Sequence, residues 1–269
     1  MNNNQDDSKW RVGSVSKALT VLKCFNFKTK ELSLVQISKL VGLPKSTAYN
    51  IVKTLVDEGF LRKSDSSQKY LPGLKLFELG YCARTTLPII SYAIPIMEDV
   101  TRVTGEITYL STINGDKLLV LEGIYPDRRF ATYTSGGKAL GMHCCSAGKI
   151  ILSTFSDDMV KKIADKGLTS STPNTITTYK ALKKELDTIR SKGFSVDNEE
   201  ETLGVRCASV AIYGSENKAV GAISISGSVR SITDKKIMQA LPLMEKAAQS
   251  LSRMAYTFPA VYPDEINKY

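Results

Sequence analysis

The first part of the chain alternates apolar and polar positions with the period of amphipathic helices. Four apolar residues recur at helical spacing and predict a helix over residues 15–25: Val15, Leu19, Leu22 and Phe25. The lysine-rich stretch 26–31 then breaks the pattern, so we expect the first helix to end there.

A second, shorter helix is marked by signals at both of its ends. Ser33 is a good N-cap, and Gln36 follows at the spacing of a capping box. Gly42 suits the left-handed conformation in which many helices end. Between these signals, one apolar face consists of Leu34, Ile37, Leu40 and Val41.

A third helix is expected to begin near Pro44 or Lys45, since proline is tolerated in a first helical turn, and to stop at Gly59. Its apolar face comprises Ala48, Ile51, Val52, Leu55 and Val56. Its polar face comprises Lys45, Thr47, Tyr49, Asn50, Lys53 and Thr54. Two short helices joined by a glycine-containing turn predict a helix-turn-helix, whose second helix enters the DNA major groove. A helical hairpin with an ordinary solvated face is the alternative.

A β-hairpin directly after the third helix favours DNA binding. Residues 60–63 and 69–71 are typical of strands, and the serine-rich segment 64–67 is typical of a turn. A hairpin in this place is the wing of a winged helix, where basic side chains meet the phosphate backbone. The residues expected at the DNA are Ser33, Lys45, Ser46, Thr47, Tyr49, Asn50, Lys53, Arg62, Lys63 and Lys69.

Pro72 and Gly73 punctuate the chain and predict a domain boundary. A connecting helix is expected over 74–84. The helices expected after it span 89–104, 146–154, 157–166, 179–192 and 234–254, and the strands span 107–113, 117–124, 129–134, 205–213 and 219–226. Hairpins and helices without regular βαβ repetition predict an α+β domain with an antiparallel sheet flanked by helices.

Charge is distributed unevenly along the 269 residues. Residues 1–74 carry 12 Lys/Arg against 6 Asp/Glu, so they hold most of the net charge of +9. Positive charge concentrated in a short segment suits a polyanionic partner, because phosphate neutralisation dominates nucleic-acid affinity. A basic surface that is simply solvated is the alternative.

The chain also lacks the features of a secreted or membrane protein. No stretch approaches the roughly 20 apolar residues of a membrane span, and the polar N-terminus lacks the apolar core of a secretory signal. The five cysteines do not form a disulfide framework or a zinc-finger spacing, so reduced thiols are expected. We therefore expect a cytoplasmic protein without membrane association.

Several sequence blocks carry a resemblance to one family. They are SVSKAL at 14–19, LPKST at 43–47, GFSVDNEE at 193–200 and LGVRC at 203–207, with shorter blocks at 142–143, 147–149 and 223–227. In their order and spacing the chain resembles the IclR family of transcriptional regulators, from about Val15 to Met254. It departs from the family pattern at Gly141, Cys144, Cys145, Ser146, Ala208 and Gly214.

The resemblance implies a GAF-like C-terminal domain that senses a small organic acid or sugar derivative. Block by block, it implies effector contacts at Thr132, Leu140, Ser146, Ala147, Asp197, Val205, Cys207, Ser224 and Ser226. Backbone N–H groups at a helix start near Ser146 favour a carboxylate, and serines two apart on a strand face the same side. Ordinary roles stay open: solvent-facing serines, Asp197 capping a turn, and Cys207 as a small core residue.

Together these features predict three parts: a winged helix-turn-helix domain over 12–73 with its helix-turn-helix at about 33–56, a linker helix over 74–88, and an effector-binding domain over 89–257. The predicted function is DNA-binding transcriptional regulation controlled by the effector, without enzymatic activity or a cofactor. The expected partners are a double-stranded DNA operator, the small-molecule effector and a second copy of the chain, as a homodimer or a pair of dimers. The linker helix is expected to take part in the dimer, and repression and activation both stay open.

Two alternatives use the single histidine and the cysteines. A metal- or redox-sensing regulator would use His143, Cys144, Cys145 and Cys207, although adjacent residues on a strand point to opposite faces. A cysteine hydrolase would pair Cys145 or Cys207 with His143, although nothing near them resembles an oxyanion-binding scaffold.

Overall fold

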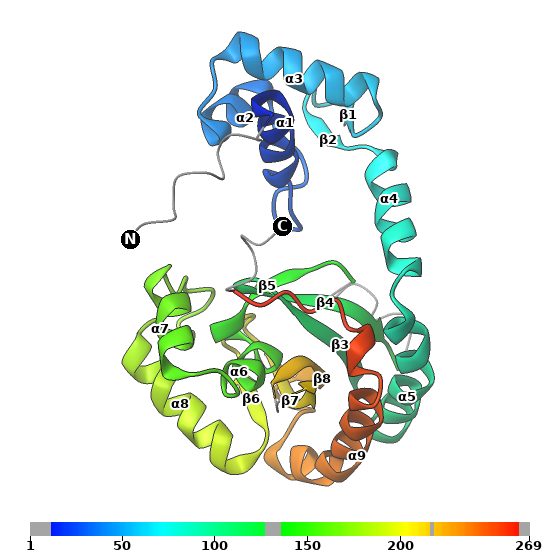
Figure 1. Ribbon diagram of the computed structural model, residues 1–269, viewed down its shortest axis with the longest axis vertical. Helices are drawn as coiled ribbons and strands as arrows, with labels where there is room; N and C mark the ends of the chain where they lie inside the picture. Colours follow the sequence, from blue (N-terminus) through cyan, green and yellow to red (C-terminus); the bar gives the residue numbers. More distant parts are fainter. Residues whose placement is uncertain (1–11, 127–135, 216–217, 264–269) are drawn as a thin grey trace. The chain divides into compact units, whose positions relative to one another are not determined.

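The computed structural model describes residues 12–126, 136–215 and 218–263, and the chain divides into two compact units after Thr86 (Figure 1). Each unit has its own apolar core. Among the described helices, none combines the length and apolar character that crossing a bilayer requires.

The smaller unit is a helical domain with one β-hairpin. Its elements are α1 (Gly13–Lys23), α2 (Leu34–Val41), α3 (Lys45–Asp57), β1 (Leu61–Lys63), β2 (Tyr70–Pro72) and α4 (Leu74–Thr85). The strands pair antiparallel, and Leu32 and Tyr70 exchange two backbone hydrogen bonds that attach the chain before α2 to the hairpin. The core consists of Val21, Leu32, Ile37, Val52, Leu55, Leu61 and Tyr70.

The ends of α2 follow from the sequence signals. Ser33 Oγ accepts a hydrogen bond from the backbone N–H of Gln36, whose Oε1 accepts one from the N–H of Ser33. Gly42 ends the helix at φ 64°, a conformation that glycine adopts without steric cost. These caps place α2 and α3 as a helix-turn-helix followed by the predicted wing.

Three apolar positions of the predicted helical stripes are exposed. Val15 and Leu19 of α1 are 55% and 50% exposed, and Leu40 of α2 is 61% exposed. The predicted helical period is correct, but α1 packs through Ala18 and Val21, so that its other apolar stripe points outward.

The larger unit is built on an antiparallel six-stranded sheet with the order β5-β4-β3-β8-β7-β6. Its strands are β3 (Ile107–Asn114), β4 (Lys117–Ile124), β5 (Ala139–Gly141), β6 (Ser195–Asn198), β7 (Val205–Tyr213) and β8 (Ala219–Ser228). Its helices are α5 (Pro88–Thr104), α6 (Ser146–Leu152), α7 (Asp157–Asp165), α8 (Tyr179–Lys192) and α9 (Asp234–Ser252), with short 3₁₀ turns at Met142–Cys144 and Ala255–Thr257.

The two faces of this sheet have different roles. One face packs apolar side chains such as Leu110, Val210 and Ile223 against α5 and α9, which lie side by side (Figure 1). The other face is covered in part by α6, which packs against Ala211 and Ala222. Helix α8 contacts α6, and α7 contacts α8. The α+β architecture with helices on both faces confirms the predicted fold class.

Strand register places polar residues in two rows across the second face. Residues paired from β3 through β8 and β7 to β6 form the row Tyr109, Ser224, Ser209, Ser195 and the row Ile107, Ser226, Cys207, Asp197. Because side chains two apart on a strand point the same way, both rows face the side of the sheet on which α6 lies. These rows position the polar side chains of the candidate site in this unit.

Most predicted elements agree with the structure to within a few residues, but two strands were missed. β5 and β6 have three and four residues and show no alternating pattern. The strand predicted over 129–134 lies outside the described residues.

Candidate functional site

The exposed surface of α3 presents the polar residues predicted for DNA contact. Lys45, Ser46, Tyr49 and Asn50 are exposed and Thr47 is half-buried, while Ala48, Val52 and Leu55 are buried against the core. This division follows from the 3.6-residue period, which puts the two sets on opposite sides. Amide, hydroxyl and ammonium groups on one helix face can hydrogen-bond base edges and phosphates.

The predicted basic residues of the wing differ in their surroundings. Arg62 and Lys63 on β1 are exposed. Lys69 Nζ lies 2.8 Å from Glu31 Oε1, and Lys53 Nζ of α3 lies 3.1 Å from Asp57 Oδ2. Arg62 and Lys63 are therefore exposed directly to solvent. Lys53 and Lys69 are in exposed ion pairs, and a phosphate would have to displace the carboxylate partner of each.

Ser33 has a structural role that the sequence also indicated. Its Oγ accepts the Gln36 N–H of the capping box at 3.3 Å, so its position is fixed by the start of α2. The hydroxyl proton is the one group that it can still offer to a phosphate.

In the larger unit, a cavity of about 70 Å³ lies against the second face of the sheet; we call it the inner cavity. Eight of the nine positions implied by the family resemblance line it: Leu140, Ser146, Ala147, Asp197, Val205, Cys207, Ser224 and Ser226. The ninth, Thr132, lies outside the described residues. Tyr109, Ser111, Leu118, Val120, Lys138, Cys145 and Glu201, which the resemblance did not include, also line it.

A chain of hydroxyl groups includes Ser146, Ser224 and Ser226 in one wall of the inner cavity and Ser209 behind it. Ser209 Oγ lies 2.6 Å from Ser146 Oγ and 2.8 Å from Ser224 Oγ, and Cys207 Sγ donates to Ser226 Oγ at 3.1 Å. Ser195 Oγ also donates to the backbone oxygen of Ser146 at 2.7 Å, which fixes the start of α6. Because a hydroxyl has one proton and two lone pairs, this wall can both donate and accept hydrogen bonds.

Asp197 is a buried carboxyl at the end of the polar row. Its Oδ1 accepts the backbone N–H of Glu200 at 2.7 Å, so it does cap a local turn while lining the cavity. Burial raises the pKa of Asp197 to about 7. The hydrogen bond from the Glu200 N–H lowers this pKa, whereas Coulomb repulsion from the Glu200 carboxylate raises it further. Asp197 can therefore exchange a proton near neutral pH.

The turn beside Asp197 is held by a buried lysine. Lys149 of α6 is 1% exposed, and its Nζ lies 2.5 Å from Glu200 Oε1 and 3.0 Å from Glu185 Oε1. The two carboxylates keep the pKa of Lys149 above its ordinary value in spite of desolvation. This arrangement ties α6 and α8 to the turn that follows Asp197.

One ion pair that sequence reasoning missed lies at the boundary of the inner cavity. Lys138 Nζ is 3.1 Å from Glu201 Oε1, and both side chains are about one-fifth exposed. Lys138 is the single cationic side chain among the described residues that line the inner cavity. Its sequence signal was weak, because a lone lysine beside a short strand resembles any surface lysine.

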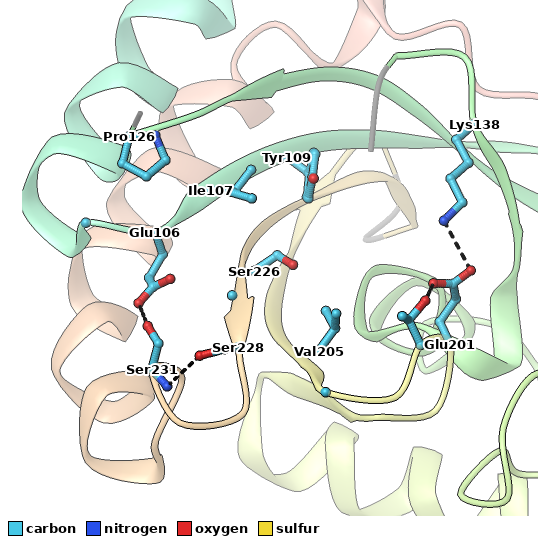
Figure 2. Close-up of a pocket in the computed structure, with 14 residues that line it drawn as sticks. Glu106, Ile107, Tyr109, Pro126, Lys138, Glu201, Val205, Ser226, Ser228 and Ser231 are labelled. Atoms are coloured by element: carbon cyan, nitrogen blue, oxygen red, sulfur yellow. Dashed lines mark hydrogen bonds and ion pairs between the residues drawn. The ribbon is translucent and has the colours of Figure 1, made fainter. Parts of the chain in front are cut away.

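A larger cavity of about 300 Å³, the outer cavity, is drawn in Figure 2. The two share Tyr109, Lys138, Glu201, Val205 and Ser226 in their walls. The other residues of the outer cavity come from the chain around Gly105–Ile107, the Thr202–Gly204 turn and the end of β8, together with Pro126 and Ser231.

The residues of the metal and hydrolase alternatives are not gathered into a reactive site. Among the described residues, no group of three or more His, Cys, Asp or Glu side chains is placed to hold a metal ion. His143 Nε2 lies 3.0 Å from the Thr169 oxygen. Burial raises the pKa of the Cys144 thiol to about 11 and that of Cys207 to about 12, and raises that of Cys145 well above its ordinary value. Thiolate nucleophiles and thiolate ligands are therefore disfavoured.

Comparison with known proteins agrees with this division of the chain. The family model described as "Bacterial transcriptional regulator IclR C-terminal" matches residues 82–253, and that described as "IclR helix-turn-helix domain" matches residues 14–65.

Individual relatives cover nearly the whole chain. The HTH-type transcriptional regulator XynR of Escherichia coli (strain K12) is 30% identical over 250 residues, which are 93% of this chain and 99% of the relative. The crystal structure of Thermotoga maritima IclR is 27% identical, with a TM-score of 0.66 and coverage of 91% of this chain and 99% of that one. An IclR homologue from Microbacterium hydrocarbonoxydans, complexed with 4-hydroxybenzoate, is 22% identical and shares the fold, with a TM-score of 0.72 and coverage of 90% and 99%.

Proposed function

The chain belongs to the IclR family of bacterial transcriptional regulators, and on that premise we propose that a small organic acid bound in the inner cavity controls its affinity for an operator. The family combines a DNA-binding helix-turn-helix with a C-terminal ligand-binding domain, and its named relatives are regulators and repressors rather than enzymes. Operator recognition is therefore assigned to the smaller unit of the chain and effector binding to the larger one.

The proposed operator contacts are made by the polar face of α3 and by the wing. Asn50 has the amide geometry that brackets an adenine edge, while Lys45 and Ser46 at the start of α3 lie where phosphates are bound. Arg62 and Lys63 add phosphate contacts beside the groove. Lys53 and Lys69 would exchange their exposed carboxylate partners for phosphates, which costs little because exposed ion pairs are weak.

The observation that carries the effector proposal is the convergence of eight family positions on one cavity whose walls hold hydroxyls, two carboxyls and one ammonium group. Lys138 supplies the positive charge for an effector carboxylate, and the serine wall with Asp197 supplies partners for a hydroxyl or carbonyl group. A few convergent polar groups are the usual arrangement of a ligand site. The relative complexed with 4-hydroxybenzoate binds an organic acid, which supports the class but not the particular molecule.

We expect the active form to be a homodimer in the cytoplasm. The helix α4 has no buried residue, and its Leu74, Phe77 and Tyr81 are 81%, 74% and 56% exposed. Three large apolar side chains on one exposed helix favour association with another apolar surface. Val15 and Leu19 of α1 add to the exposed apolar surface of the smaller unit, and a second copy of the chain offers the matching surface by symmetry.

The operator proposal is tested by fluorescence anisotropy of a labelled DNA fragment from the region upstream of the protein's own gene. We expect Asn50→Ala to weaken binding about tenfold or more, because a bidentate base contact is worth about 1–3 kcal/mol. Lys192→Ala, at an exposed position of α8, is the matched control and leaves affinity unchanged. An unchanged affinity in Asn50→Ala would contradict the placement of α3 on DNA.

The effector proposal is tested with the same fragment in the presence of a panel of small organic acids. We expect at least one acid to change operator affinity, and Ser224→Ala to remove that response while leaving the affinity without acid unchanged. Ser191→Ala, an exposed serine of α8, is the control and keeps the response. A full response in Ser224→Ala would overturn the assignment of the inner cavity.

A further inference from the structure

The segment that follows α9 crosses the end of the larger sheet, beyond the residues that the family models match. In Figure 1 it is drawn in red and runs from the end of α9 back along the sheet. Phe258 belongs to the core formed with α5 and α9, whereas Ala260 and Tyr262 pack against the core on the α6 side of the sheet. Residues 258–262, which we call the strap, therefore contact both cores of the larger unit.

Two aromatic side chains hold the strap in place. The ring of Tyr262 lies 6.1 Å from that of Phe155, and its hydroxyl donates a hydrogen bond to the backbone oxygen of Ala219 at 3.2 Å. The ring of Phe258 lies over Gly221, where a Cβ would come within 2.6 Å of Phe258 Cε1. The missing side chain of Gly221 thus makes room for the strap, which is seated by specific contacts at both ends.

The backbone of the strap closes on the turn between β3 and β4. The Val261 N–H donates to the Ile113 oxygen at 3.1 Å, and the Gly115 N–H donates to the Val261 oxygen at 2.7 Å. These bonds form a parallel bridge between Val261 and Asn114. Because Gly115 is buried and its N–H is engaged by the strap, this amide proton is withheld from solvent.

The dipeptide Asn114–Gly115 has a chemical reactivity of its own, and no other asparagine in the sequence precedes a glycine. Once the N–H after an asparagine loses its proton, the nitrogen can attack the side-chain carbonyl carbon. Glycine permits this approach because it has no Cβ. Asn114 is exposed, and its carboxamide has no hydrogen-bond partner among the described residues. The carbon that would be attacked is therefore accessible, and the strap restrains the attacking nitrogen.

We propose that Asn114 is a deamidation site and that the strap controls it. When the strap lifts, the Gly115 N–H loses its proton to base in the solvent, and the nitrogen forms a bond to Asn114 Cγ. The Cγ–Nδ2 bond breaks, and the nitrogen of the carboxamide takes up a proton and leaves as ammonia. Water then opens the cyclic succinimide at one of its two carbonyl carbons, which gives aspartate or isoaspartate, and no group is oxidised or reduced.

Neither product restores the original turn. Isoaspartate places one more carbon in the backbone before Gly115, which breaks the pairing of residue 114 with Lys117 and with Val261. Aspartate places a carboxylate next to Asp116, where like charges repel. The reaction is therefore a lasting record that the strap has opened. Neither the effector nor the operator takes part in this chemistry.

The test compares deamidation in the full-length wild type and in Tyr262→Ala, both incubated at neutral pH and physiological temperature. Digestion with pepsin in acid, where the reaction is slow, precedes mass spectrometry of the peptide that contains Asn114. We expect Tyr262→Ala to react about tenfold faster or more, because loss of the ring contact and the hydroxyl bond raises the population with an open strap. Tyr256→Ala, at a tyrosine that is 81% exposed, is the matched control and keeps the wild-type rate.

Hydrogen exchange of the Gly115 amide gives a second readout, since exchange and deamidation both require loss of the same proton. We expect Tyr262→Ala to accelerate this exchange by the same factor as deamidation and to leave exchange in the centre of β8 unchanged. If Tyr262→Ala does not fold, Tyr262→Phe removes only the hydroxyl bond to Ala219 and is expected to raise both rates about threefold.

Four results would overturn the proposal. A wild type that deamidates as fast as a synthetic peptide of residues 112–117 would show that the strap protects nothing. Equal deamidation in the wild type and both Tyr262 variants would remove control by the strap. Faster exchange at Gly115 without faster deamidation would exclude Asn114 as the reactive residue. An equal increase of exchange in β8 would assign the reaction to unfolding of the whole unit.

Discussion

The buried carboxyl of Asp197 makes the stability of the protein dependent on pH in a defined direction. Its pKa rises from an ordinary value of 3.8 to about 7 in the folded chain, chiefly because the carboxyl is removed from water. Between these two values the folded chain keeps a proton that the unfolded chain has lost. The free energy of unfolding therefore decreases as the pH rises through this interval, and levels off above pH 7.

The size of the effect follows from the two pKa values. For each pH unit between the two pKa values, the free energy of unfolding decreases by about 1.4 kcal/mol. Because of Asp197, the free energy of unfolding of the wild type therefore falls by about 3 kcal/mol between about pH 5 and pH 8. Asp197→Asn removes the titration and keeps an oxygen that can accept the Glu200 N–H. We therefore expect the variant to gain about 3 kcal/mol over the wild type across the same range, whatever its difference at pH 5.

The measurement is urea denaturation under reducing conditions, followed by far-UV circular dichroism, of the wild type and variant at four pH values between 5 and 8. Asp165→Asn, the same change at the exposed end of α7, is the control and is expected to follow the wild type at every pH. A difference between Asp197→Asn and wild type that is independent of pH would refute the reasoning. A difference that changes in the opposite direction would show that the folded chain favours the ionised carboxylate.

Three further predictions concern the smaller unit. Phe77→Glu places charge on the exposed apolar surface of α4 and is expected to convert dimers to monomers in analytical ultracentrifugation; an unchanged mass would contradict the proposed interface. Gly73→Ala adds a Cβ that would overlap backbone atoms, so it is expected to lower the free energy of unfolding by about 1–3 kcal/mol. Gly80→Ala, in helix α4 where nothing lies within 4 Å of the added Cβ, is expected to raise it by about 0.5–1 kcal/mol. Urea denaturation compares the two variants, and the reverse order of stability would disprove the packing argument. Lys45→Ala is expected to reduce the slope of log operator affinity against log salt concentration by about one counterion, and Asn50→Ala is expected to leave that slope unchanged. Equal slopes for the two variants would place Lys45 away from phosphate.

Local signals in the sequence were sufficient for the helix-turn-helix. The Ser33 and Gln36 capping box and the left-handed Gly42 act within a few residues, so their geometry does not depend on the rest of the chain. Which apolar stripe faces the core does depend on it, and this is why the exposure of Val15 and Leu19 could not be predicted from the sequence. Periodicity identifies a helix but does not choose between two apolar faces of it.

The cavities depended on pairing between distant strands, and the sequence alone contained less information about them. Family resemblance supplied the positions of the inner cavity, such as Asp197 and Ser224, but not their neighbours Lys138 and Ser209. Glu106 of the outer cavity was missed because a single acidic residue between a glycine and an apolar strand is typical of a helix–strand turn. Its burial arises only when Ser231 and Lys236, more than 100 residues later in the chain, are brought to it.

The pairing of β3 with β8 at the centre of the larger sheet has a consequence for synthesis on the ribosome. Ile107 and Ser226 are neighbours in the sheet although more than 100 residues separate them, whereas the smaller unit closes its core within residues 1–86. Distant contacts of this kind form late and slowly, because a long loop has to close first. During translation the domain that recognises the operator can thus be complete while the walls of both cavities do not yet exist. A nonsense mutation before Ala219 is therefore expected to leave the smaller unit able to fold but to remove the proposed effector site.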